Sequence, residues 1–294
     1  MPTRPDVRRA LAIAVAAVLL VPGATAAQGR GNGRPKQPAT TVPSTTPSTA
    51  PAPSGPNSIP QFGFWLDDAS TPAEGTGYTG IAIAYWRGLG DASNVSQIDV
   101  PVLGLTYGVT NRVQLSATVP FYRVRYQGIT ARGLDDVYVS GKVAVVDPAA
   151  TGHFGLAVGS ALEILSVGNP DQSRVQWAVP VSVEFRGDSV RVYGSTGYFS
   201  RGAIFAAGAF EWTAAAGTAI TATLAQSMST VAASPDAALP RNALRDISVF
   251  VAHPLTDRLR AYAGLGRTFA SAGAAGDAVT LSGGVSLSFS AVQP

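Results

Sequence analysis

Apolar and polar positions alternate along the chain from about residue 76 to its C-terminus. The stretch from Arg174 to Arg186 shows the pattern most clearly, with Val175, Trp177, Val179, Val181, Val183 and Phe185 in one phase and Gln176, Ala178, Pro180, Ser182, Glu184 and Arg186 in the other. Successive side chains of a β-strand point to opposite faces of its sheet. One face of such a strand suits hydrocarbon and the other suits water.

The alternation recurs in segments of roughly ten residues that end at turn residues, which is the pattern of a transmembrane β-barrel. We predict an all-β fold, a transmembrane antiparallel up-and-down barrel of about 12 strands; the count is even, as is usual for bacterial single-chain barrels. The predicted strands are 76–87, 97–107, 112–125, 133–146, 153–166, 174–186, 189–199, 202–213, 217–229, 243–253, 258–270 and 277–289. Aromatic residues near strand ends, among them Trp86, Trp177 and Trp212, predict interfacial girdles.

The predicted connections alternate in length across most of the chain, with a short exception at 200–201. Short links rich in turn formers are expected at 108–111, 147–152, 187–188, 214–216 and 254–257, and longer ones at 88–96, 167–173 and 230–242. Barrels of this kind have short periplasmic turns and longer outer loops. The alternation therefore favours an oriented barrel in the bacterial outer membrane over a soluble β-sandwich.

One hairpin can be registered from its residues. A two-residue loop at Gly187-Asp188 suits a type II′ turn and would place Glu184 opposite Arg191 and Phe185 opposite Val190. The apolar pair would then share the outer face. We expect Glu184 and Arg191 to meet inside the barrel.

The N-terminal quarter has a different composition. Residues 1–27 combine Arg4, Arg8 and Arg9 with a short apolar core and small residues, as in a signal peptide of a Gram-negative export substrate. Residues 28–60 are rich in Pro, Ser and Thr and predict a disordered periplasmic linker. Residues 61–75 hold three aromatics and Asp67-Asp68, and are expected at the periplasmic mouth of the barrel, which itself spans 76–294.

Composition excludes several function classes. The chain has no Cys, so disulfide and thiolate chemistry are absent. Its formal net charge is +3, and three basic residues and one acid lie in the first 27 positions, so the remainder is close to neutral and gives no electrostatic case for nucleic acid. Two His residues without clustered carboxylates predict no metal site, and we expect no cofactor.

The segment from Tyr107 to Arg112 (Tyr-Gly-Val-Thr-Asn-Arg) is followed by Val119-Pro120-Phe121-Tyr122, then by Gly133-Leu134-Asp135-Asp136 and Lys142, and the turn recurs weakly from His253 to Arg258. This order resembles the outer-membrane barrel family named for the phenol-degradation MetA pathway. The sequence departs from that family at Asp135, where Gly is favoured. The resemblance implies a transporter of small, often hydrophobic molecules.

Charged side chains in the inward phase are the candidates for contact with a solute. The pore-lining candidates are Asp136, Lys142, Glu163, Glu184, Arg191, Glu211 and Arg260. They would either form a constriction of mixed sign or brace a narrow barrel through ion pairs. His153 and His253 fall at the periplasmic rim, where a barrel hydrolase would not work, so we predict no catalytic residue.

These observations lead to one functional hypothesis and two alternatives. The hypothesis is a monomeric outer-membrane channel for passive passage of small molecules, hydrophobic or aromatic ones included, in contact with outer-membrane lipid and lipopolysaccharide. The first alternative is a structural or anchoring barrel with a filled lumen and a periplasmic tether that contacts the cell wall. The second is a barrel hydrolase.

Overall fold

The computed structural model describes residues 66–89, 93, 95–126, 128–166, 174–200, 202–229, 244–270 and 277–290. The expected signal peptide and linker lie outside these residues. In the described part, no helix is long and apolar enough to cross a membrane.

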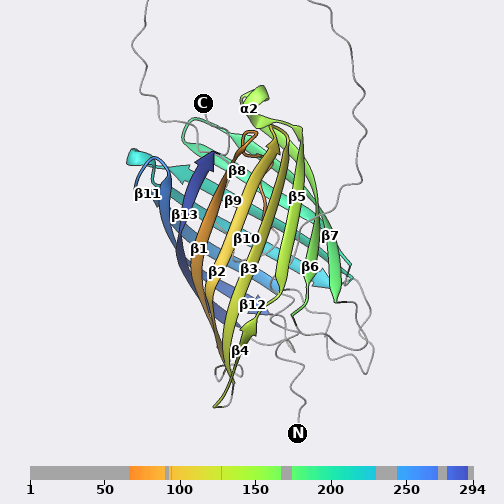
Figure 1. Cartoon of the computed structure of the whole chain (residues 1–294), viewed down its shortest axis with the longest axis vertical. Coiled ribbons are helices and arrows are strands. Elements are labelled where there is room, and N and C mark those ends of the chain that lie inside the picture. The colour runs from red at the N-terminus through yellow and green to blue at the C-terminus, as the bar shows by residue number, and fades with distance from the viewer. Residues whose placement is uncertain are drawn as a thin grey trace, which may run out of the picture.

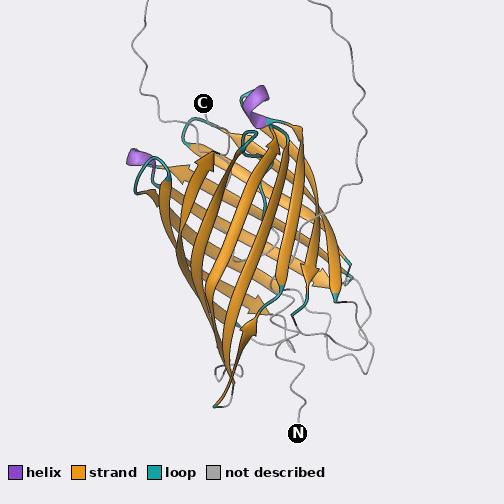
Figure 2. Cartoon of the chain, in the orientation of Figure 1, coloured by secondary structure: helices purple, strands orange, loops and turns teal. Residues whose placement is uncertain are grey.

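Antiparallel strands dominate the described chain and close on themselves (Figures 1 and 2). The strands are β1 (Thr76–Gly88), β2 (Val95–Thr110), β3 (Val113–Tyr126), β4 (Ile129–Leu134), β5 (Val137–Val146), β6 (Phe154–Ile164), β7 (Val175–Arg186), β8 (Val190–Phe199), β9 (Ala203–Thr213), β10 (Ala219–Ser229), β11 (Leu244–Pro254), β12 (Leu259–Ala270) and β13 (Ala278–Ser290). Each pairs with the next strand in sequence, except that β4 does not pair with β5, which pairs with β3 instead. Pairing of β1 with β13, from Thr76↔Ser290 to Gly88↔Ala278, closes the barrel. The prediction of a twelve-stranded antiparallel barrel is confirmed, with β4 as one additional strand.

The predicted strand 133–146 is wrong in its first part. It divides into β4, which pairs only with β3, and β5, which joins the barrel wall. Asp135 and Asp136 cause the division: the Asp135 carboxylate accepts from the Asp136 backbone N–H, and the Asp136 carboxylate accepts from Ser166 N–H. Aspartate side chains that bind nearby backbone groups compete with strand pairing in this way.

Apart from the connections that join β3 to β4, β4 to β5 and β8 to β9, the short connections lie at one end of the barrel. They are the turn 111–112, the segment around α2 (Pro148–Thr151), the turn 187–189, the segment around η2 (Ala215–Gly217) and the turn 255–258. The first residue of β1 and the last of β13 lie at this end too. We call it the short-turn end and the other the open end; α2 marks the former and β4 the latter in Figure 1.

The outer surface is an apolar band. Exposed residues of the apolar phase include Trp177 (48%), Val179 (42%), Val181 (37%), Val183 (46%) and Phe185 (59%) on β7 alone, and Leu281 and Leu287 on β13 follow the same rule. Trp177 and Phe185 stand about 26 Å apart along their strand, which is about 20 Å along the axis of a barrel whose strands tilt by about 40° and lies within the apolar height of membrane barrels. Trp212 is also exposed. The girdle prediction is wrong for Trp86, because exposed Tyr85 and Arg87 flank it and its side chain therefore faces the lumen.

The predicted register of the β7–β8 hairpin is also wrong, by one loop position. Gly187 N–H donates to Val190 C=O over 2.7 Å, so Asp188-Ser189 is the two-residue loop. Arg186 therefore lies opposite Arg191, and Glu184 lies opposite Tyr193. The shift moves each partner by two residues and so preserves which face each side chain occupies.

Candidate functional site in the barrel lumen

The structure brings four of the seven predicted pore-lining residues into one network. Lys142, Glu184, Arg191 and Glu211 are each less than 5% exposed and lie in the half of the lumen near the short-turn end. Asp136 and Glu163, also buried, lie nearer the open end, and Arg260 is the second residue of β12 and has no ion pair within the described network. All seven belong to the lumenal face or to its margin.

Residues 66–70, which we call the lumenal segment, lie inside this network. Lys142 of β5 donates to the Asp67 carboxylate (2.9 Å), the Asp68 carboxylate (3.1 Å) and the Asp68 carbonyl (2.9 Å). Lys142 Nζ thus places all three of its donors on two consecutive residues. The same two residues are thereby fixed against β5.

Arg191 of β8 holds the segment from the other side. Its guanidinium pairs with the Asp68 carboxylate, with Glu184 Oε1 of β7 (2.7 Å) and with Glu211 Oε1 of β9 (3.6 Å). The guanidinium also lies over the ring of Tyr193, 4.6 Å from its centroid. A buried cation with three carboxylates and an aromatic face has little freedom to move.

Glu184 of β7 is the third residue, after Lys142 and Arg191, that binds the lumenal segment. It accepts hydrogen bonds from Ala69 N–H (3.2 Å) and from the Ser70 hydroxyl, and it pairs with Arg186. Arg186 also donates to the Ser70 hydroxyl. The lumenal segment therefore contacts β5, β7 and β8 through charges, and it crosses the lumen in its short-turn half.

Apolar packing complements these charges. Leu66 is buried against Tyr193 and Ala209 of the barrel wall, and Asp67 N–H donates to Ser195 Oγ over 3.1 Å. Sequence reasoning expected the 61–75 region at the mouth of the barrel but assigned no role to Asp67, Asp68 or Ser70. An acidic pair directly after three aromatics was the available signal.

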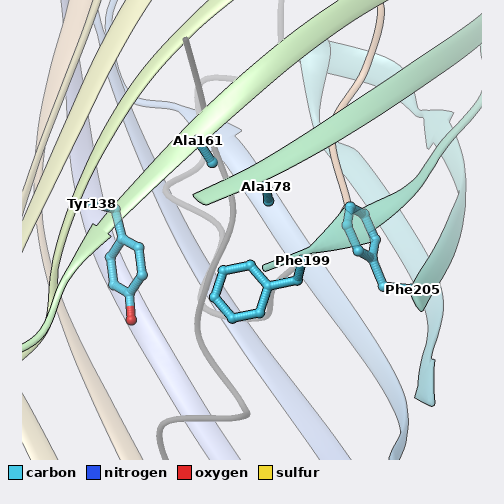
Figure 3. Close-up of a cluster of buried hydrophobic side chains, with 5 residues drawn as sticks. All are labelled: Tyr138, Ala161, Ala178, Phe199 and Phe205. Atoms are coloured by element: carbon cyan, nitrogen blue, oxygen red, sulfur yellow. The ribbon is translucent and has the colours of Figure 1, made fainter. Parts of the chain in front are cut away.

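An aromatic cluster occupies the lumen farther from the short-turn end. Figure 3 shows its five residues, contributed by the consecutive strands β5 to β9: Tyr138, Ala161, Ala178, Phe199 and Phe205. Phe199 is 2% exposed and Phe205 is 1% exposed. Gly197 makes room for them, because a Cβ there would lie 2.8 Å from the Phe205 ring. Phe199 and Phe205 are bulky apolar residues in an otherwise small and polar phase, which was the signal that sequence reasoning missed.

Polar groups border the aromatic cluster. The Tyr138 hydroxyl donates to Glu163 Oε1 over 3.2 Å, and Glu163 is fully buried. Ser200 donates to the Gln176 side chain over 2.8 Å. At this level of the lumen, buried aromatic side chains therefore pack beside polar groups that are hydrogen-bonded to one another.

Lumenal charge is sorted along the barrel. In the open-end half, the described strands carry no basic side chain in the lumenal phase, although exposed Arg174 precedes β7 in the phase of Gln176; the carboxylates of this half are Asp99, Asp135, Asp136, Glu163 and Asp246. The lumenal bases Lys142, Arg186, Arg191 and Arg260 all lie in the short-turn half. Acidic and basic residues of the inward phase look balanced in the sequence, but the structure separates them along the barrel axis.

The two histidines lie at the short-turn end, on exposed positions. His153 Nδ1 lies 3.1 Å from the Arg186 carbonyl, and His253 Nδ1 lies 2.8 Å from the Thr218 hydroxyl. His153 thus contacts a residue of the lumenal network only at its backbone carbonyl, and the contact of His253 with Thr218 does not involve the network. Among the described residues, no group of three His, Cys, Asp or Glu side chains could hold a metal ion.

Comparison with known proteins identifies the fold. No family model and no curated protein matches the chain. An outer membrane channel from Pseudomonas putida F1, known from its crystal structure, superposes with a TM-score of 0.56 at 15% identity, covering 76% of this chain and 98% of that one. The NanC porin superposes with a TM-score of 0.51 at 11% identity, covering 70% of this chain and 98% of that one. The chain has the fold of outer-membrane channels.

Proposed function

We propose that the protein is a channel of the bacterial outer membrane for passive passage of small molecules, aromatic ones included, and that it is not an enzyme. The observation that carries the proposal is the buried aromatic cluster of Tyr138, Phe199 and Phe205 inside a closed barrel. A barrel that needed only to persist in lipid could fill that level with aliphatic side chains. Phe199, Phe205 and Glu163 are almost fully covered, so we propose that a flat apolar solute with a polar substituent displaces the groups that cover them and packs against the aromatic faces.

The proposed path begins at the open end, passes the aromatic cluster and reaches the lumenal segment. We propose that the segment is a gate that must move before a solute passes. In this arrangement the open end faces the cell exterior, and the short-turn end faces the periplasm together with residues 28–60. Residues 1–27 are the export signal in the same proposal.

The turn at residues 107–112 supports a finer assignment. We propose that the chain belongs to the barrel family named for the phenol-degradation MetA pathway. Its turn at Asn111-Arg112 joins β2 to β3, as the resemblance requires.

An anchoring barrel with a filled lumen is the second candidate. The ion pairs between the lumenal segment and Lys142 and Arg191 favour it, because buried networks of this kind also brace a wall. The two candidates differ in whether solute crosses the barrel.

A measurement of solute flux distinguishes the channel from the anchoring barrel. Protein refolded into liposomes should raise the uptake of a small phenolic solute above that of empty liposomes, and a Phe199→Ala/Phe205→Ala variant should change uptake of the phenol more than uptake of a small sugar. A Leu281→Ala variant, altered on the lipid face, is the control. Uptake equal to that of empty liposomes for both solutes would favour the anchoring barrel.

A further inference from the structure

Strands β2, β3 and β4 continue past the barrel wall at the open end. β5 leaves β3 at Thr118↔Tyr138, and beyond it β3 pairs with β4 from Phe121↔Leu134 to Tyr126↔Ile129. β2 accompanies β3 as far as Val95↔Tyr126. The result is a three-stranded extension, visible in Figure 1 as the part that projects beyond the barrel at β4.

The outward face of this extension is basic. Arg123 and Arg125 of β3 share the outward phase with Phe121, and Arg132 of β4 lies directly opposite Arg123. All three arginines are exposed, and so is Arg87 of β1. Ser96 of β2 is paired with Arg87 on one side and with Arg125 on the other, so these two arginines stand about 10 Å apart.

Nothing on these strands neutralises the four arginines. Within the described strands β1 to β4 the only acidic residue is Asp99, and its side chain faces the lumen, where it accepts from Gln97. Like charges directly opposite each other, as in Arg123 and Arg132, destabilise a strand pair. An external anion bound between Arg123 and Arg132 would relieve this repulsion.

The position of the arginines along the barrel axis suggests which anion they bind. Phe121 and Leu134, exposed at 39% and 44%, are paired on the outward face immediately below the arginines. The arginines thus begin where the apolar band ends, at the depth of the lipid headgroups. Guanidinium groups bind phosphate through paired hydrogen bonds.

We infer that Arg87, Arg123, Arg125 and Arg132 form a binding surface for the phosphate groups of outer-leaflet lipid, in the manner of phosphorylated lipid A. The inference rests on the outer-membrane placement proposed above, but it needs no open channel. A barrel that never conducts and still binds lipid A through these residues would defeat the proposed function and leave this surface standing.

Native mass spectrometry of the refolded full chain with phosphorylated lipid A tests the surface. Each basic group near an anionic lipid surface contributes about fivefold to binding, so Arg123→Gln/Arg125→Gln/Arg132→Gln should weaken binding by about a hundredfold. Arg112→Gln/Arg258→Gln, which alters exposed arginines at the short-turn end, is the matched control and should bind as the wild type does. Retained heat-modifiable migration on electrophoresis verifies that each variant is folded.

Dephosphorylated lipid A gives the second comparison. It should bind weakly and equally to the wild type and the triple variant. The inference is overturned if the triple variant keeps wild-type affinity, if the control variant loses as much, or if removing the phosphates leaves wild-type binding unchanged.

Discussion

Removing one anchor of the lumenal segment should open the barrel. Asp68 is 1% exposed and receives both Lys142 and Arg191. Loss of one partner from a buried ion pair costs about 3–5 kcal/mol. In Asp68→Asn, Lys142 keeps its ion pair with Asp67 and Arg191 keeps its ion pair with Glu184. We therefore expect the docked position of the lumenal segment to be destabilised by about 2–3 kcal/mol. At 1.4 kcal/mol per factor of ten, the ratio of released to docked segment should rise about 30- to 150-fold.

Single-channel recording in planar bilayers measures this ratio as open probability. Asp277→Asn is the matched control, because it removes an aspartate from the exposed pair with Arg267 (2.8 Å) on the outside of the barrel. An Asp68→Asn protein that folds normally yet records the same open probability as the wild type and the control would refute the gating argument.

Three further results are expected. Glu184→Gln should lower the free energy of unfolding by about 3 kcal/mol, followed by heat-modified electrophoresis, because buried Arg191 and half-buried Arg186 each lose a carboxylate partner; unchanged migration would contradict this. Small cations should permeate better than small anions, and Glu163→Gln should reduce that preference in reversal-potential measurements, whereas a preference for anions would be inconsistent with the acidic open-end half. His153→Ala/His253→Ala should leave solute flux unchanged. A loss of flux would instead support the barrel hydrolase or a role for the two histidines in transport.

Alternation predicted the barrel well because it has a period of two. The alternation assigns each residue of β7 from Val175 to Phe185 to one side of the sheet without knowledge of its pairing. An error of one position in the loop therefore does not change the predicted side. The same property explains the wrong hairpin register, since pairing Glu184 with Arg191 or with Tyr193 leaves every face unchanged. The two residues still meet, because diagonal neighbours lie within reach of long side chains.

The site was predictable only in part. The inward phase located Lys142, Glu184, Arg191 and Glu211 on the lumenal face, but it does not contain their partners in the lumenal segment. Asp68 and Ser70 precede the first strand and reach Arg191 and Glu184 across more than 110 positions of sequence. No local pattern encodes such a contact. The break at Asp135-Asp136 was likewise hidden, because two side-chain hydrogen bonds overrode an otherwise regular alternation.

Flux of a small phenolic solute through liposomes tests the central claim most directly, with the wild type compared against a chain in which residues 66–70 are replaced by glycine and serine. The account predicts measurable flux through the wild type and a clear increase when the lumenal segment can no longer bind Lys142, Glu184 and Arg191. Flux equal to that of empty liposomes for both proteins, with both correctly folded, would contradict a channel closed by this segment.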